Sequence, residues 1–270
     1  MAAFAGVIRQ RTEYLVRIQR VSKEYGAGHT GVKALRQASL TLEPGEFVLL
    51  QGPSGSGKTT LLSIMGLLMK PSGGRVWLCG KDVTEMGEAE LPRMRLKHIG
   101  FIFQTFNLFP ALSAFHNVAL ILKLKGYGWR ARRKEAARLL ERVGLGECMH
   151  RKPGDMSGGQ RQRVSIARAL AGDSDLILAD EPTAALDTAT GLEIMTLLKE
   201  QTRSGQRAAL IVTHDPRLER FATRVDRIID GTLSVGSGLH AKVLSPHESI
   251  LSGVSQNTPV GMQGITPAPV

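Results

Sequence analysis

A glycine-rich stretch in the first quarter of the chain constrains the fold more than any other feature. Residues 52–60 read Gly-Pro-Ser-Gly-Ser-Gly-Lys-Thr-Thr, which fits the pattern G-x-x-x-x-G-K-[ST] of a phosphate-binding loop. Residues 46–51 before it form a short apolar run of strand formers. Apolar residues at helical spacing follow it, from Leu61 to Leu68, until residues 71–74 (Pro-Ser-Gly-Gly) should stop the helix. The stretch therefore predicts a strand, a tight loop and a helix in that order.

Such a loop is an anion site for two physical reasons. Glycines let successive backbone N–H groups point inward, and the helix N-terminus adds partial positive charge. The Lys58 ammonium should contact the outer phosphates of a nucleotide, and the Thr59 hydroxyl should bind Mg²⁺. A glycine-rich turn with an incidental lysine is the alternative, but the flanking strand and helix disfavour it. The nucleotide-binding residues predicted here are Gly52, Pro53, Ser54, Gly55, Ser56, Gly57, Lys58, Thr59 and Thr60.

Composition narrows the partners and the compartment. The 270 residues carry 35 Lys and Arg against 24 Asp and Glu, a net charge of +11. This charge suits a phosphate-rich ligand, nucleic acid or an anionic membrane face, although a solvated basic surface is also possible. Cys79 and Cys148 lack metal-ligand spacing, which predicts a reducing compartment without disulfides. The N-terminal apolar run is too short for a signal peptide, and no stretch of about 18 apolar residues predicts a membrane span.

Apolar strands alternate with helical patterns along the rest of the chain. Residues 176–180 and 208–213 read as buried strands, and they end at Asp180-Glu181 and at His214. This alternation predicts a mostly parallel sheet covered on both faces, with ligands at the carboxyl edge of its strands. Shorter strands at 14–21, 38–42 and 76–79 predict a small antiparallel sheet. In the first of these, Val16, Ile18 and Arg20 are expected to share one face. The apolar run 100–106 predicts a buried position for its glutamine, Gln104.

Helices are expected from about 110 to 126, from 130 to 143 and from 157 to 171. The second begins with a basic cluster, which is most simply a solvated face, with lipid-headgroup or nucleic-acid contact as the alternative: Arg130, Arg132, Arg133 and Lys134. The third begins with Ser157 and Gln160 at the spacing of a capping box. A capped helix start followed by Gly158 and Gly159 is also an anion site.

The order of these motifs resembles the ATP-binding cassette (ABC) family over about residues 14–235. The matching stretches are the phosphate loop, 103–104 (Phe-Gln), 156–160 (Met-Ser-Gly-Gly-Gln), 176–181, 185–187 (Ala-Leu-Asp) and 213–215 (Thr-His-Asp). The resemblance implies an α/β P-loop NTPase fold (RecA-like), with a mostly parallel core sheet, a small antiparallel β subdomain and an inserted helical subdomain at about 105–170. We expect an N-terminal extension at 1–13, an ATPase domain at 14–236 and a weakly structured tail at 237–270.

The resemblance also implies roles for single residues in Mg²⁺-dependent ATP hydrolysis. Asp180, Thr59 and Gln104 match the magnesium-binding residues, and Gln104 also contacts the attacking water. Glu181 matches the general base, and His214 matches the histidine that bonds the γ-phosphate. Tyr25 lies where the family has its adenine-stacking aromatic. The residues that match the signature motif and the loop crossing to the other subunit are Ser157, Gly158, Gly159, Gln160 and Asp187.

The partners implied are a second copy or a homologous ATPase subunit and a separate transmembrane permease. Residues 106–110 and 179–187 resemble ATPases of macrolide export and lipoprotein release, which places the chain on the inner face of the cytoplasmic membrane. Met156 departs from the family's usual leucine, an apolar change that should be tolerated. An alternative is a soluble ABC ATPase acting on nucleic acid or the ribosome. The single cassette without a heptad run or cysteine cluster disfavours it, so we expect no nucleic acid. A force-transmitting role in cell division or envelope remodelling remains open.

Overall fold

The computed structural model describes residues 12–26, 31–203 and 205–236. The predicted tail at 237–270 and most of the predicted N-terminal extension lie outside these residues. The core is a six-stranded sheet whose order is β10 (Thr232–Ser234), β9 (Arg224–Ile229), β3 (Phe47–Gln51), β8 (Ala208–Val212), β7 (Leu176–Asp180) and β6 (Ile99–Ile102). All neighbouring strands from β9 to β6 pair in parallel, and β10 pairs antiparallel with β9. The predicted mostly parallel α/β sheet is therefore confirmed.

Single-residue alternation along the central strands builds a core on each face of this sheet. Phe47 and Leu49 point to one face, while Val48 and Leu50 point to the other. The strands β7 and β8 follow the same alternation, and almost every residue of the three central strands is buried. Successive side chains of a strand point to opposite faces, so a continuous apolar run is what a sheet covered on both sides requires.

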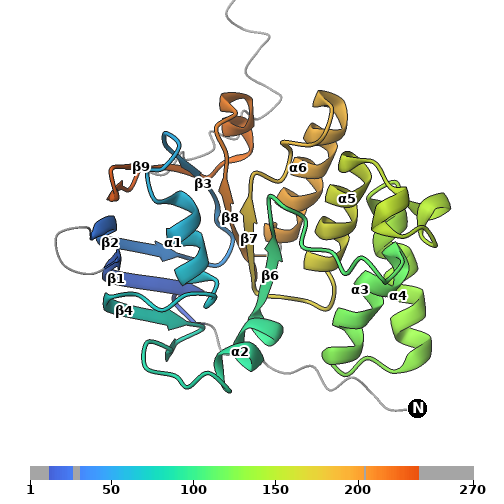
Figure 1. Ribbon diagram of the computed structural model, residues 1–270, viewed down its shortest axis with the longest axis horizontal. Coiled ribbons are helices and arrows are strands. Elements are labelled where there is room, and N and C mark those ends of the chain that lie inside the picture. The colour runs from blue at the N-terminus through green and yellow to red at the C-terminus, as the bar shows by residue number, and fades with distance from the viewer. Residues whose placement is uncertain (1–11, 27–30, 204, 237–270) are drawn as a thin grey trace, which may run out of the picture. The chain divides into compact units, whose positions relative to one another are not determined.

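A second, antiparallel sheet covers one face together with α1 (Lys58–Met65). Its order is β2 (Val32–Leu42), β1 (Val16–Tyr25), β4 (Gly73–Leu78) and β5 (Lys81–Asp82). Figure 1 shows α1 between this sheet and the core sheet, and their apolar side chains share one cluster.

The set of residues predicted to share one face of β1 is wrong at one position. Arg20 has φ +47° at a register shift between Ile18 and Val21, so Val21 is buried and Arg20 is exposed.

Helices cover the other face of the core sheet, on the right in Figure 1. They are α3 (Ala114–Leu124), α4 (Trp129–Arg142), α5 (Gly158–Ala169) and α6 (Thr188–Thr202). The short helix α2 (Leu91–His98) precedes β6, and 3₁₀ turns lie at Gly146–Cys148, Pro153–Asp155 and Pro216–Phe221. The helices expected near 110–126, 130–143 and 157–171 correspond to α3, α4 and α5.

The helix after the phosphate loop is shorter than its apolar pattern predicts. It ends at Met65 with Gly66 as the C-cap, and Leu67 has φ +55°. A Cβ on Gly66 would lie 2.6 Å from the Phe101 ring, so only glycine allows this close approach. The sequence Pro-Ser-Gly-Gly at 71–74 therefore does not stop the helix, and its glycines begin β4.

Three side chains that could ligate a metal ion lie close together at the amino edge of the core sheet. Asp175 Oδ2 lies 2.6 Å from His98 Nδ1, and Cys79 Sγ lies 3.4 Å from the same nitrogen. Two ligands of a tetrahedral zinc ion would lie about 3.3 Å apart, given metal–ligand distances of about 2.0 Å. The 2.6 Å separation fits a hydrogen bond between imidazole and carboxylate, so this pair ties the end of α2 to the start of β7.

Candidate functional site

The loop between β3 and α1 is packed against two other strands through its glycines. Gly57 has φ +104°, and a Cβ there would lie 2.4 Å from the Ala34 carbonyl oxygen of β2. A Cβ on Gly52 would lie 2.1 Å from the Ile228 carbonyl oxygen of β9. These glycines are therefore required by close backbone approach as well as by the turn itself. At the loop's tip, a Cβ on Gly55 would meet only open space, so that part of the loop faces outward.

The polar groups of this loop fit a phosphate ligand. The Lys58 ammonium donates to the Gly52 and Pro53 carbonyl oxygens, at 2.8 and 2.7 Å, and so lies across its own loop. The Ser56 hydroxyl oxygen is buried and has no hydrogen-bond partner among the described residues. A buried polar group without a partner is costly, and a phosphate oxygen would supply one.

Strand register brings the acidic and histidine residues to the same edge as this loop. Val212 of β8 is paired with Leu50 of β3 on one side and with Asp180 of β7 on the other. One position after Asp180, β7 runs into Glu181, and two positions after Leu50, β3 runs into the loop at Gly52. Because β3, β8 and β7 are adjacent and parallel, their carboxyl ends meet, which is where ligands bind in open α/β sheets.

Two oxygens suited to magnesium meet at the start of α1. The Thr59 hydroxyl donates to Asp180 Oδ2 at 2.9 Å. Burial raises the pKa of the Asp180 carboxyl, while the Thr59 hydrogen bond and the Lys58 charge act in the opposite direction. Hydroxyl and carboxylate oxygens are ligands that Mg²⁺ prefers, and a buried carboxylate gains most from a nearby cation. The residues present therefore fit the ion.

The raised pKa of Asp180 predicts that Asp180→Asn stabilises the ligand-free protein. Below the unfolded-state pKa the carboxyl is neutral in both states; as pH rises through the folded-state pKa, the wild type loses stability because its buried carboxyl must ionise. Asparagine keeps an acceptor for Thr59 and carries no charge. The melting temperature of Asp180→Asn should exceed that of the wild type by a few degrees at neutral pH, roughly 2–4 °C per kcal/mol in a domain of this size.

Thermal melts from acidic to neutral pH check this expectation. The advantage of Asp180→Asn should grow as pH rises and then level off, while adding Mg²⁺ and ATP should stabilise the wild type and leave the variant nearly unchanged. Equal melting temperatures across that range would show that burial does not penalise the Asp180 carboxylate.

The pair Glu181 and His214 lies directly beside this metal position. Glu181 Oε1 accepts from His214 Nδ1 at 2.7 Å, and the Glu181 side chain is 12% exposed against 76% for His214. Glu181 has φ +48°, a conformation that costs of order 1–2 kcal/mol in a non-glycine residue, and its N–H donates to the Val212 carbonyl. The strained backbone and the imidazole together hold the carboxylate at the sheet edge.

Tyr25 lies at the end of β1 next to the start of α1. Its hydroxyl donates to Met69 Sδ at 3.1 Å and lies 3.4 Å from Thr60 Oγ1. The Lys23 ammonium lies 5.5 Å from the ring centroid, and the residue as a whole is 42% exposed. The structure therefore places an exposed aromatic ring beside the phosphate loop.

The serine–glycine–glycine–glutamine segment forms a separate structure at the start of α5. Ser157 Oγ accepts from the Gln160 N–H at 3.2 Å, and the Ser157 N–H donates to Gln160 Oε1 at 3.0 Å, so the predicted capping box is present. A Cβ on Gly159 would lie 3.1 Å from the Ala185 carbonyl, which places the segment beside the start of α6. There Asp187 caps the helix by accepting from the Thr190 N–H at 3.0 Å. No hydrogen bond among the described residues joins Ser157 or Asp187 to residues 52–60.

The expected burial of Gln104 is wrong. Strand β6 ends at Ile102, so Gln104 follows the strand and its side chain is exposed at the carboxyl edge. Exposure also excludes a core role for Gln104, in which backbone groups would bond a buried side-chain amide. It leaves the side chain accessible to a ligand at this edge.

Sequence reasoning missed the arginines of α5 that hold the segment after Gln104. Buried Arg168 donates to the carbonyls of Phe106, at 2.9 Å, and Asn107, two consecutive residues with φ +64° and +46°. Burial lowers the pKa of Arg168 to about 10. Arg161 lies 5.6 Å over the Phe106 ring and donates to the Met156 carbonyl at 3.0 Å. These contacts hold the segment after Gln104 against α5. The only feature of the sequence that hints at them is the set of arginines inside this helix.

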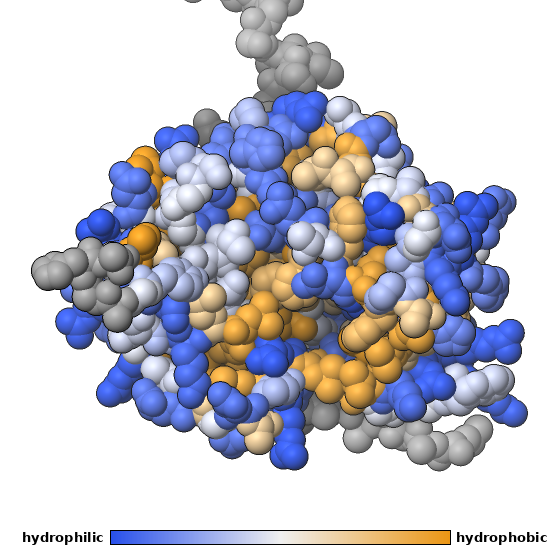
Figure 2. Space-filling model, viewed as in Figure 1, coloured by the Kyte–Doolittle hydropathy of each residue, from blue (hydrophilic) through white to orange (hydrophobic). Residues whose placement is uncertain are grey.

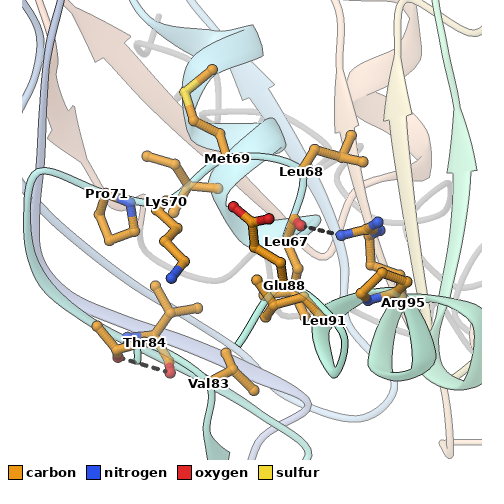
Figure 3. Close-up of a pocket in the computed structure, with 13 residues that line it drawn as sticks. Leu67, Leu68, Met69, Lys70, Pro71, Val83, Thr84, Glu88, Leu91 and Arg95 are labelled. Carbon is orange, nitrogen blue, oxygen red and sulfur yellow. Dashed lines mark hydrogen bonds between the residues drawn. The ribbon is translucent and has the colours of Figure 1, made fainter. Parts of the chain in front are cut away.

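An apolar cavity of about 340 Å³ lies outside this edge, between the end of α1, β4 and α2. Figure 3 shows Leu68 and Met69 on one side and Leu91 and Val83 on the other, with Leu67 and Glu88 between them and Lys70 and Arg95 at the two ends. Leu68 is 45% exposed. The space-filling view in Figure 2 shows apolar surface gathered on this face of the molecule.

Comparison with known proteins identifies relatives of this fold and site. The family model described as ABC transporter matches residues 35–184. The macrolide export ATP-binding/permease protein MacB of Hyphomonas neptunium is 44% identical over 84% of this chain and 35% of its own length. MacB 1 of Yersinia pestis is 44% identical over 83% of this chain and 34% of its own. The chain thus spans about a third of the length of these curated relatives.

Solved structures give the same result. Two structures of the ATP-binding cassette MJ0796, a dimeric bacterial ABC transporter cassette and a dimeric post-hydrolysis state bound to ADP and Pi, are 41% identical with a TM-score of 0.78. Each match covers 83% of this chain and 99% of the other. Among the described residues, no helix is long and apolar enough to cross a membrane.

Proposed function

Because the chain belongs to the ABC transporter family, we propose that it binds and hydrolyses ATP to drive a separate membrane permease. One observation carries this proposal. The phosphate loop, the Thr59–Asp180 pair and the Glu181–His214 pair converge on the carboxyl edge of three adjacent parallel strands. A phosphate-binding loop beside a metal position and an oriented carboxylate is the arrangement that phosphoryl transfer to water requires.

Each group at this edge has a proposed role. Residues 52–60 bind the phosphates through backbone N–H groups, and Lys58 leaves its own carbonyls to contact the β- and γ-phosphates. Tyr25 stacks on the adenine. Thr59, Asp180 and Gln104 hold Mg²⁺, which neutralises charge on the phosphates when it is bound. Glu181 accepts the proton of the attacking water, and His214 orients its carboxylate and reaches the γ-phosphate.

The second half of each site is proposed to come from another subunit. In the described part of the chain, Ser157 and Asp187 make no hydrogen bond to the loop of their own chain, yet Ser157 opens a capped, glycine-flanked helix N-terminus suited to an anion. Their placement apart from residues 52–60 supports a dimer with two shared ATP sites. A dimeric structure bound to ADP and Pi is described for the relative MJ0796.

The permease is proposed because the curated relatives are named as combined ATP-binding and permease proteins. We propose that the permease contacts the apolar cavity beside α1 and the part of the helical segment 105–156 outside the turn between α3 and α4, which would place the chain on the inner face of the cytoplasmic membrane. Export and force transmission both fit this arrangement. Action on nucleic acid or the ribosome finds no support in the relatives.

Purification from detergent-solubilised membranes tests this function. The full chain should show Mg²⁺-dependent ATPase activity and should carry a membrane protein with it. Leu68→Asp, at the cavity, should reduce the amount of that membrane protein severalfold and keep ATPase activity. Val235→Asp is the matched control, because Val235 is similarly exposed after β10 and outside the cavity. Absence of ATPase activity would contradict the proposed ATP hydrolysis. Equal recovery of the membrane protein with both variants would contradict the proposed contact at the cavity.

A further inference from the structure

The turn between α3 and α4 carries two large apolar side chains that face solvent. Leu124, the last residue of α3, is 57% exposed, and Trp129, the first residue of α4, is 62% exposed. We call residues 123–134 the α3–α4 corner. The corner is anchored from behind, because the Lys125 ammonium donates to the Gly172 carbonyl at 2.8 Å and to Ser174 Oγ at 2.9 Å. The exposed tryptophan is therefore presented on a fixed turn.

Positive charge surrounds these apolar side chains. The corner contains six Lys or Arg residues and no Asp or Glu. Four of them are exposed and make no ion pair in the described part of the chain: Lys123, Arg130, Arg133 and Lys134. Lys125 is engaged with the backbone behind the corner and is not counted among them. The Arg133 guanidinium lies 5.8 Å from the Trp129 ring centroid, so charge and ring form one surface.

The basic residues at the start of α4 do not stabilise this helix. The N-terminus of a helix bears partial positive charge and favours acidic residues, yet the first turn of α4 has none. Arg130 and Lys134 are four residues apart on the same side, where like charges repel. Gly128 caps the helix without a side-chain hydrogen bond. Stability of the isolated domain therefore does not explain the cluster, whereas an anionic surface against it would.

We propose that the α3–α4 corner rests on the anionic phospholipid surface of the membrane. Trp129 and Leu124 enter the headgroup region, and the four exposed cations contact lipid phosphates. A nucleic acid suits the corner less well. It would require a groove or several stacking rings, whereas the corner exposes one large ring, Trp129, beside the aliphatic Leu124, and its second ring, Tyr127, is half-buried. This contact goes beyond the proposed ATPase function and does not involve the nucleotide site.

The tryptophan content of the chain makes this contact directly measurable. The sequence has two tryptophans, Trp77 in β4 and Trp129 at the corner, so Trp77→Phe leaves Trp129 as a single reporter. Added to vesicles of phosphatidylcholine and phosphatidylglycerol, this variant should sediment with them and its emission should shift to the blue. Salt should weaken the binding, because exposed charges are screened. Vesicles of phosphatidylcholine alone should bind at least tenfold less.

A charge-reversal pair and a matched control locate the contact. In the Trp77→Phe background, Arg130→Glu with Arg133→Glu should weaken vesicle binding roughly tenfold or more. Arg93→Glu with Lys97→Glu makes the same charge change on exposed residues of α2 and should have much less effect. ATPase activity in solution should be unchanged in both, which shows that they fold. Equal losses in the two pairs, equal binding to neutral vesicles, or binding of a single-stranded RNA oligomer in place of vesicles would overturn the proposal.

Discussion

Glu181→Gln is expected to bind ATP about as tightly as the wild type and to lose nearly all steady-state ATPase activity. The amide keeps the size of the side chain but cannot accept a proton, and general-base catalysis contributes typically 10²–10⁴-fold. The backbone of Glu181 should persist, since its N–H bond to Val212 does not involve the side chain. ATP turnover and nucleotide affinity measured on the same preparation check this, and size-exclusion chromatography should show a dimer stabilised by ATP.

Glu219→Gln is a matched control for this change. Glu219 is another carboxylate near the same sheet edge, where it accepts from the Gln51 amide at 2.9 Å, and glutamine can still accept there. We expect it to keep most of the activity. Full activity in Glu181→Gln, or a similar loss in both variants, would remove Glu181 from the role of general base.

The parts of the fold that sequence predicted best are those set by local, continuous patterns. The strand Leu176–Asp180 is an unbroken apolar run up to its final aspartate, and the structure forms a strand over the predicted residues, with a parallel strand on each side. The capping box at Ser157 needs only two residues at fixed spacing, and both of its hydrogen bonds are present. The fold class and membership of the ABC transporter family, predicted from the order of motifs, are confirmed by the comparisons.

The parts that sequence missed depend on contacts between distant residues. Strand β9 was not predicted because it contains Arg224 and Asp226, which read as surface residues; in the fold Arg224 bonds both Glu46 and the fully buried Asp226. Helix α2 was missed because it is basic and buries none of its residues. Helix α1 ends early at Gly66, where Leu67 turns to φ +55°, and the close approach of the Phe101 ring to Gly66 is a tertiary contact that no local pattern indicates.

The residues of the candidate site also fall into two groups, those predicted from local motifs and those placed by contacts between distant residues. The loop and the acids were predicted from motifs, and the register of three strands explains why they meet. The exposure of Gln104 and the hydrogen bonds from Arg168 to Phe106 and Asn107 follow from tertiary packing, so no local pattern in the sequence predicts them. Arg168 links two segments 61 residues apart, a contact that a single sequence cannot reveal.

Mixing Lys58→Ala with Ser157→Arg should restore a function that neither variant has alone. If Ser157 completes the site of the opposite subunit, Lys58 and Ser157 of one chain serve different ATP sites. Each homodimer then has two damaged sites, while a heterodimer has both lesions in one site and none in the other. Loss of the lysine should weaken ATP binding about tenfold to a hundredfold, as expected for a hydrogen bond from a charged group. Single-turnover hydrolysis in the mixture should exceed that of either variant alone.

Two controls make this result decisive. Heterodimers must be shown to form, by sequential purification on two different affinity tags. Ser157→Asp serves as a second variant, because aspartate is a good N-cap and keeps the acceptor for the Gln160 N–H, while its charge repels a phosphate. If capping is the only role of Ser157, Ser157→Asp alone should be active and need no partner. If the site is shared, it should be inactive alone and gain activity with Lys58→Ala. A shared-site heterodimer contains one undamaged pair of Lys58 and Ser157 and should therefore recover. Heterodimers that show no recovery in ATP binding or single turnover would count against the shared site.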